Sequence, residues 1–407
     1  MTYFVYYAIV LVRFVVTMPL MEVTEMIDLK NRAWAEISLD NIEYNYREIR
    51  QRVPKESKIC CVVKADAYGH GAPRVAKRLE RAGADFFAVS NVDEALQLRR
   101  ANISTPILIL GYTPPTRIKE LADNNISQCV YSYEYAELLT LAATESNVKI
   151  SVHIKIDSGM GRLGFVFRHD EESLDELIDV CSRKCFDLEG IFTHFPTADG
   201  GDSCKTATQM HFKHFKRVIE ALEKKGISFK IKHCANSATA LDYPEYSLDM
   251  VRIGISLYGV LPSNDMNTDV CLKPTMTLRT VISNVKSVKK GDTIGYGAEY
   301  VAKKDMNIAT LPIGYADGFR RINYTSQTKI YVNGTACDIV GRVCMDQIMI
   351  DVDPLDEVHV GDVAVIFGEG AKTSLWEFSK NNFTIPYEIL CSVSSRVPRF
   401  YLGNNDD

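Results

Sequence analysis

The sequence predicts an N-terminal (β/α)8 barrel followed by a smaller all-β domain. Between residues 58 and 255, short runs rich in β-branched residues alternate with longer segments of helical period, which is typical of parallel βα units. After Tyr258 the helical segments give way to short apolar runs separated by turn residues, which favours an all-β domain. Eight βα units over about 230 residues match the size of a (β/α)8 barrel.

The eight barrel strands are expected at residues 58–63, 85–89, 106–110, 128–131, 149–156, 187–193, 229–233 and 250–255. Helical periodicity between them predicts helices at residues 72–82, 93–100, 133–143, 171–181 and 207–225. Gly83 and Gly226 follow two of these helices, where a glycine in left-handed conformation commonly ends a helix.

The second domain is expected to begin after a linker within residues 261–273, because residues 262–265 are a turn-rich Pro-Ser-Asn-Asp segment. Short strands then extend from residue 275 to 367, separated by the turn pairs Gly291-Asp292, Asn333-Gly334 and Gly361-Asp362. The predicted parts are therefore an N-terminal extension at residues 1–33, the barrel at 34–264 and the β domain at 265–402.

The composition indicates a soluble globular protein in a reducing compartment. Of 407 residues, 46% are hydrophobic and 24% are charged, and the net charge of -5 provides no basic excess for a nucleic-acid backbone. The 11 cysteines include no CxxC pair, which argues against a disulfide framework or a zinc ribbon. We therefore expect a cytoplasmic protein with no nucleic-acid partner.

The N-terminal extension contains an apolar run at residues 3–16, which Arg13 interrupts. This run is too short for a typical bilayer span, and no signal-peptide cleavage site is clear. We expect an upstream start or a disordered tail and no membrane partner, with membrane tethering as the alternative.

Polar side chains gather at the carboxyl ends of the predicted strands, where barrels of this type carry their chemistry. One such residue alone would indicate a satisfied salt bridge or a core histidine, but several on one barrel face indicate a functional site. The residues concerned are Lys64, Lys155, His194, His233, Ser237 and Arg252.

These residue types favour pyridoxal phosphate (PLP) as the cofactor. A lysine in a partly dry, electropositive pocket has a lowered pKa and is therefore nucleophilic. Ser237 and the backbone N–H groups near Gly254 and Ile255 are suited to holding a phosphate. A Schiff-base aldolase on the same barrel shares this pattern and stays open at this level.

Two further motifs are interpreted as structural. Gly159-x-Gly161-x-x-Gly164 matches a dinucleotide fingerprint, but no acidic residue ends the next strand, so we expect the glycines to turn Arg162 toward the site. His211 and His214 share a helix face, but no cysteine or carboxylate completes a metal site. A solvated helix face and no bound metal are expected there.

Several segments, taken in order, resemble the motifs of bacterial alanine racemases, and the resemblance extends from about residue 34 to 400. The first is Val63-Lys64-Ala65-Asp66-Ala67-Tyr68-Gly69-His70-Gly71, similar to the PLP-attachment signature of that family. The others are Lys155-Ile156-Asp157-Ser158-Gly159-Met160-Gly161-Arg162, Thr193-His194-Phe195, Asn236-Ser237-Ala238, Val251-Arg252-Ile253-Gly254-Ile255, Gly295-Tyr296-Gly297-Ala298, Pro312-Ile313-Gly314-Tyr315-Ala316-Asp317-Gly318, Gly341-Arg342-Val343-Cys344-Met345-Asp346 and Arg396-Val397-Pro398-Arg399.

The resemblance implies a fold-type III PLP enzyme that interconverts L- and D-alanine and so supplies D-alanine for peptidoglycan. It implies a homodimer whose active sites are shared between the subunits. Lys64 would bind PLP and act as one base, and Tyr296 of the partner subunit would act as the second base. A pair such as His194 and Arg252 lies beside that tyrosine in the family, and a nearby positive charge lowers a tyrosine pKa.

The resemblance also assigns roles to further residues. Arg252 would face the pyridine nitrogen and leave it unprotonated. Lys155 would be the lysine that is often carbamylated in the family. The cofactor-binding positions are Lys64, Tyr68, Arg162, His194, Ser237, Arg252, Gly254, Ile255 and Tyr387, the substrate-binding positions are Arg162 and Met345, and the substrate corridor is lined by Asp199, Tyr315, Arg342 and Ile385.

Three alternatives accompany this prediction. A racemase of the same fold acting on serine or on a broader range of amino acids would carry the same motifs, because a pocket that fits a methyl group rejects an added hydroxyl poorly. A fold-type III decarboxylase would have an acidic residue in place of Arg252. A non-catalytic PLP-carrier protein of the barrel-only kind would lack the β domain that holds Tyr296.

Overall fold

The computed structural model describes residues 31–168, 174–322 and 324–403. The chain divides between Arg32 and Ala33, and only the part from residue 33 onward is treated below. The predicted N-terminal extension therefore lies almost wholly outside the described residues. Within the ranges given above, no helix has the length and apolar character needed to cross a membrane.

Eight parallel strands form a nearly closed barrel in the order β10-β2-β3-β4-β5-β6-β8-β9. Two backbone hydrogen bonds, from Asp249 to Lys232 (3.0 Å) and from Arg252 to Ala235 (2.9 Å), connect the two ends of this order. Each strand overlaps one predicted range. The strands are β2 (Lys58–Val62), β3 (Phe86–Val89), β4 (Ile107–Ile109), β5 (Ile126–Val130), β6 (Ile150–Asp157), β8 (Phe186–Phe192), β9 (Ile231–His233) and β10 (Met250–Ile253).

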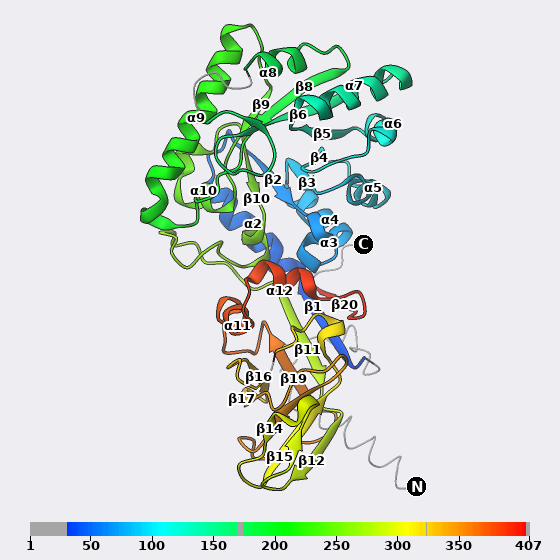
Figure 1. Cartoon of the computed structure of the whole chain (residues 1–407), viewed down its shortest axis with the longest axis vertical. Helices are drawn as coiled ribbons and strands as arrows, with labels where there is room; N and C mark the ends of the chain where they lie inside the picture. Colours follow the sequence, from blue (N-terminus) through cyan, green and yellow to red (C-terminus); the bar gives the residue numbers. More distant parts are fainter. Residues whose placement is uncertain (1–30, 169–173, 323, 404–407) are drawn as a thin grey trace. The chain divides into compact units, whose positions relative to one another are not determined.

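Helices surround these strands (Figure 1). Several begin at a serine or asparagine whose side-chain oxygen accepts a free backbone N–H, as Asn91 does from Glu94 and Ser132 from Tyr135. Gly83 has φ 100° and ends α4, as the sequence predicted. The helices are α2 (Leu39–Arg52), α4 (Ala72–Ala82), α5 (Val92–Arg100), α6 (Ile118–Asp123), α7 (Tyr133–Ser146), α8 (Leu174–Cys181), α9 (Lys205–Lys224) and α10 (Ser237–Asp242).

The second domain is built on three small sheets, so the predicted fold class is confirmed. Its six-stranded sheet has the order β17-β16-β19-β11-β1-β20, and the other two have the orders β12-β15-β18 and β13-β14. Two short helices that the sequence analysis did not anticipate, α11 (Leu375–Asn381) and α12 (Pro386–Ser392), follow β19. The strands are β1 (Ala33–Ser38), β11 (Met276–Val281), β12 (Asn284–Val288), β13 (Thr293–Ile294), β14 (Tyr300–Val301), β15 (Met306–Leu311), β16 (Lys329–Val332), β17 (Thr335–Asp338), β18 (Ile348–Asp351), β19 (Val363–Phe367) and β20 (Arg399–Leu402).

Strand β1 corrects the predicted start of the barrel. The sequence pattern predicts that residues 34–38 belong to the barrel, but β1 lies between β11 and β20 in the six-stranded sheet. Trp34 is paired antiparallel with Arg279, and Ala35 is paired parallel with Arg399. Because β1 has a neighbour on each side, its backbone hydrogen bonds are satisfied only in the second domain. The predicted boundary between residues 264 and 265 stays a prediction.

A buried asparagine fastens the first helix to the segment that leaves the barrel. Asn45 on α2 is fully buried, and its amide nitrogen donates to Leu257 O (3.1 Å) and Lys273 O (2.9 Å). Its side-chain oxygen accepts the N–H of Lys273 at 2.8 Å. These three bonds fix the path of the linker before β11 begins.

Replacing Asn45 should therefore destabilise the fold. We expect Asn45→Ala to lower the free energy of unfolding by about 2–3 kcal/mol, because it leaves buried backbone groups without partners. Asn41→Ala is the matched control on the same helix, since Asn41 makes one exposed bond to Pro274 O. Denaturant unfolding measures both variants, and equal losses would contradict the role given to Asn45.

Candidate active site

A turn of left-handed helix follows the first barrel strand. β2 ends at Val62, and Lys64 opens the short segment α3 (Lys64–Gly69). From Ala65 to Tyr68 the φ angles lie between 52° and 55°. Left-handed helical geometry costs an L-residue about 1–2 kcal/mol, so contacts outside the turn must hold it. The turn fixes the path of the chain directly after Lys64.

The second domain supplies several of those contacts. Buried His70 places Nδ1 at 2.9 and 3.0 Å from two carbonyl oxygens of the turn, and its Nε2 lies 2.8 Å from Thr275 Oγ1. Burial lowers the pKa of His70 to about 4, so the ring is neutral at pH 7. Arg399 on β20 donates to Gly69 O at 3.1 Å. The turn is thus fixed between the barrel and the β domain.

Four predicted cofactor positions meet beside this turn. The Tyr68 ring lies 6.2 Å from the Tyr387 ring, centroid to centroid. The N–H of Gly254 donates to Ser237 Oγ at 2.9 Å. A β-carbon on Gly254 would lie 2.7 Å from the Tyr68 hydroxyl, so the absence of a side chain at residue 254 lets Tyr68 pack against the backbone there. Ile255 follows as a buried residue at the start of the 3-10 turn Ile255–Tyr258.

Lys64 is half-buried at the edge of this group. Burial lowers the pKa of its amine, and the charge of Arg162 lowers it further, whereas the charge of Glu94 opposes the shift. A larger fraction of the amine is therefore neutral than for an exposed lysine, as nucleophilic or basic chemistry requires.

Arg252 is a buried cation held by neutral acceptors. Its guanidinium donates to Thr193 O (2.8 Å) and Cys234 O (3.1 Å), and its Nη2 lies 3.4 Å from His194 Nδ1. Within the described part of the chain no carboxylate pairs with it. Burial lowers the pKa of Arg252 to about 10, so it stays charged at neutral pH. Burial, followed by the charge of Arg252, lowers the pKa of His194 well below its usual value.

Lys155 lies inside the barrel on β6 and is 5% exposed. Its amine has no hydrogen-bond partner among the described residues, and it lies 4.5 Å from the centre of the Phe192 ring. Burial and the charge of Arg252 lower its pKa well below the usual value. Lys155 is therefore a buried amine without a hydrogen-bond partner among the described residues, and burial and the charge of Arg252 disfavour its charged form.

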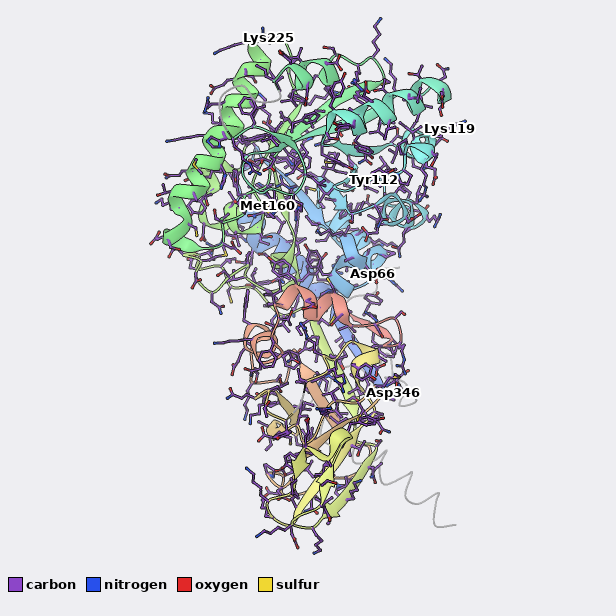
Figure 2. All side chains as sticks on the ribbon, viewed as in Figure 1. Asp66, Tyr112, Lys119, Met160, Lys225 and Asp346 are labelled. Atoms are coloured by element: carbon purple, nitrogen blue, oxygen red, sulfur yellow. The ribbon has the colours of Figure 1, made fainter. Side chains whose placement is uncertain are left out.

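The glycine-rich motif forms a loop that carries Arg162. Gly159, Gly161 and Gly164 all have positive φ, and Asp157 accepts the N–H groups of the first two at 2.9 Å each. No helix opens within this motif, which agrees with its interpretation as a turn rather than a dinucleotide site. In Figure 2, Met160 marks this loop on the barrel.

His211 departs from its predicted role. The sequence analysis placed it on a solvated helix face, but it is 7% exposed and its Nδ1 lies 2.6 Å from Ser158 O. A β-carbon on Gly159 would lie 2.0 Å from the His211 ring, so the histidine packs directly under the loop. Among the described residues, no cluster of three side chains suited to a metal ion occurs.

The remaining predicted residues form a second group on the β domain. Tyr296 is 67% exposed and Met345 is 53% exposed. Tyr315 lies beside Met345, because consecutive N–H groups at 315 and 316 donate to the carbonyls of residues 344 and 345. Arg342 pairs with Glu299, with Nε 2.8 Å from Oε2. Figure 2 shows Asp346, next to Met345, on the β domain, whereas Asp66 marks the barrel turn.

The structure therefore brings the predicted residues together as two groups. The first group lies beside the left-handed turn and includes Tyr68, Ser237, Gly254 and Tyr387, and the second lies on the β domain. Two corridor residues belong with the first group: the charge of Asp199 acts on Tyr387, and Ile385 is two residues from Tyr387. Tyr315 and Arg342 belong to the β-domain group. Among the described residues, no hydrogen bond, ion pair or ring contact joins Lys64 to Tyr296.

Comparison with known proteins identifies the family. The family described as "Alanine racemase, N-terminal domain" matches residues 37–262, and "Alanine racemase, C-terminal domain" matches residues 275–401. The chain belongs to the alanine racemase family. A curated alanine racemase of Desulforamulus reducens is 44% identical over 376 residues, which cover 92% of this chain and 100% of that protein.

Solved structures of alanine racemases agree. The Clostridium difficile 630 enzyme is 43% identical, with a TM-score of 0.87 over 93% of this chain and 97% of that chain. The Bacillus anthracis enzyme with bound L-Ala-P is 36% identical, with a TM-score of 0.86 over 92% of this chain and 96% of that one. The resemblance predicted from the motifs is confirmed.

The racemase-family barrel also contains a hydrogen-bonded chain that sequence analysis did not find. His233 Nδ1 lies 2.9 Å from Arg252 Nη1, His233 Nε2 lies 2.9 Å from His153 Nδ1, and His153 Nε2 lies 3.0 Å from Glu189 Oε2. Because an arginine only donates, His233 accepts at Nδ1 and donates from Nε2. His153 therefore accepts at Nδ1 and donates from Nε2 to Glu189. Both imidazoles are then neutral, and each has one fixed tautomer. The one sequence feature that could have indicated this chain of bonds is a histidine, His153, within a strand rich in β-branched residues.

Glu189→Gln should weaken this chain of bonds. Burial raises the pKa of Glu189, but hydrogen bonds from His153 and Ser127 outweigh it and hold the pKa below its usual value. A lowered carboxyl pKa contributes stability that is complete above about pH 5 and lost at lower pH. We expect the variant to lose about 1–2 kcal/mol of unfolding free energy at pH 7, and less near pH 4.

Denaturant unfolding between pH 4 and pH 8 measures this loss. Asp187→Asn on the same strand is the control, because Asp187 is exposed and makes one surface ion pair with Lys230. A loss in Glu189→Gln that does not change with pH, or that the control shares, would contradict the fixed-tautomer account.

Proposed function

We propose that this protein interconverts L- and D-alanine, using PLP bound at Lys64. The observation that carries the proposal is a lysine of lowered pKa placed beside the group formed by Tyr68, Ser237, Gly254 and Tyr387, in a chain of the alanine racemase family. The β domain distinguishes the chain from barrel-only PLP carriers.

The residues present fit PLP. Two hydroxyls, those of Tyr68 and Ser237, lie against the backbone of Gly254, and hydroxyl groups beside a backbone without a side chain suit a phosphate. The nearby charges of Arg162 and Arg252 favour an anionic ligand. When bound, PLP supplies an aldehyde that links to amines and a ring that withdraws electrons from the substrate α-carbon.

Lys64 and Arg252 have distinct tasks in this proposal. The neutral amine of Lys64 binds the cofactor and then moves the α proton on one face of the substrate. Arg252 stays charged, and its guanidinium would keep the pyridine nitrogen of a bound cofactor unprotonated. A weaker electron sink disfavours transamination and similar side reactions.

Two residues hold the substrate carboxylate. Arg162, carried by the glycine loop, pairs with it, and the backbone N–H of Met345 from the β domain donates to it. Lys155 supports Arg162 if its neutral amine binds CO2: the nitrogen forms a bond to carbon, one proton leaves to water, and the resulting carboxylate pairs with Arg162. An unpaired buried amine of low pKa is suited to this reaction.

In this proposal the second base comes from another copy of the chain. Racemisation removes the α proton from one face and returns it to the other, so two groups on opposite faces are needed. Tyr296 is exposed on its own β domain and has no contact with Lys64 there. We therefore propose a homodimer in which Tyr296 of the partner subunit faces Lys64. The charge on Arg252, acting through His194, would stabilise its phenolate.

A cytoplasmic location is part of the proposal. All the cysteines, from Cys60 to Cys391, are free thiols. Free thiols in this number are suited to a reducing compartment.

Shared active sites can be tested with mixed dimers. Lys64→Ala and Tyr296→Phe chains, each inactive alone, are co-expressed with different tags and the mixed dimer is purified. One of its two sites then combines an intact lysine with an intact tyrosine, so we expect about half the wild-type alanine racemisation. Chiral chromatography measures the rate.

A second pairing is the matched control. A wild-type chain paired with a chain carrying both substitutions should be inactive, because each shared site then lacks one base. If each active site lay within one chain, the dimer of the two single variants would be inactive and the dimer with one wild-type chain would keep about half the activity. That result, or a wild-type protein without racemase activity, would contradict the proposal.

A further inference from the structure

A carboxylate connects the lysine turn to the neighbouring loop of the barrel. Glu94 lies in the first turn of α5, which follows β3, the strand next to β2. Its Oε1 accepts the N–H of Ala65 at 2.8 Å, and its Oε2 accepts the N–H of Ser90 at 2.7 Å. Ala65 is the first residue of the left-handed turn. The two oxygens of one side chain therefore join two βα loops.

The position of Glu94 is itself fixed. Its backbone N–H donates to the side-chain oxygen of Asn91, which caps α5, at 3.0 Å. Its neighbours Val92 and Ala95 are buried, so α5 packs on the barrel at this point. The described residues form no ion pair with Glu94, so its charge is not neutralised by an adjacent arginine or lysine. The carboxylate is thus held by two backbone N–H donors and by the capped start of α5.

The charge of Glu94 acts on the amine of Lys64. Of the groups that act on the Lys64 amine, burial and Arg162 disfavour its charged form, whereas Glu94 and the thiol of Cys391 favour it. Glu94 is the carboxylate among them. It is bonded to the backbone N–H of the residue directly after Lys64, which fixes the path of the chain there.

We propose that Glu94 is a positioning residue for Lys64, whose carboxylate anchors the start of the left-handed turn and counters the charge of Arg162 at the lysine amine. The inference rests on the proposed function of Lys64 as the PLP-binding base. Without Glu94 the Ala65 N–H loses its acceptor, and the strained turn loses its attachment to α5. The lysine amine then also loses the carboxylate that counters the charge of Arg162.

The test follows the amine itself rather than turnover. The full-length chain is treated with hydroxylamine to release PLP, and Lys64 is labelled with a trace of acetic anhydride at a series of pH values. Mass spectrometry of the peptide that contains residue 64 gives the labelling midpoint. Glu94→Gln removes a negative charge, so we expect the midpoint to move to lower pH and labelling near pH 7 to rise several-fold.

Two other variants separate charge from geometry. Glu94→Asp keeps the charge but shortens the side chain, so the midpoint should stay near the wild-type value while hydrogen exchange at residues 63–71 becomes faster. Asp93→Asn is the control, because Asp93 is the adjacent acidic residue and pairs instead with Arg117. It should change neither the midpoint nor the exchange.

An unchanged midpoint in Glu94→Gln, or unchanged exchange in Glu94→Asp, would overturn the proposal. Neither measurement depends on racemase activity. If the midpoint and the exchange change as expected while wild-type protein fails to racemise alanine, Glu94 keeps its positioning role and the proposed function fails.

Discussion

Burying a positive charge away from water costs several kcal/mol unless an anion accompanies it. The carboxyl end of this barrel gathers Lys64, Lys155 and Arg252, and its interior gives no carboxylate partner to the last two among the described residues. This cost determines the charges of the basic groups in the site. Burial lowers the pKa of both lysines, Arg252 keeps its charge, and His194 is held neutral. The group as a whole attracts anions such as a phosphate or a substrate carboxylate.

The structure supports this arrangement with two kinds of fixed contact. Behind Arg252, neutral imidazoles of defined tautomer connect the guanidinium to Glu189 without placing a carboxylate against it. Beside Lys64, the β domain holds a left-handed turn through His70 and Arg399, and Glu94 holds its first N–H. The second domain thus fixes the lysine of its own barrel, and in the proposed dimer it would also supply Tyr296 to the other barrel.

Sequence analysis predicted the parts of this picture that depend on local pattern. The eight strands were found because β-branched runs and helical periods alternate, and Lys64 and Arg252 were found because cations at the ends of apolar runs are unusual. The left-handed turn was not predicted, because Ala65, Asp66, Ala67 and Tyr68 carry no signal for positive φ. The pairing of β1, the buried setting of His211 and the bond from His153 to Glu189 depend on residues far apart in the chain. The motifs placed Tyr296 in the site, but no pattern within one chain shows which copy supplies it.

The central claim is that two bases on opposite faces of one substrate racemise alanine. Incubating the purified protein and PLP with L-alanine or L-serine in D2O tests it most directly, with chiral chromatography and mass detection following both enantiomers and their α-deuterium. The account predicts that alanine approaches equal amounts of both enantiomers with deuterium incorporated, and that serine lags behind. Deuterium exchange of alanine without inversion would show only one working face and contradict the role of Tyr296, and faster inversion of serine would contradict the assignment of alanine as substrate.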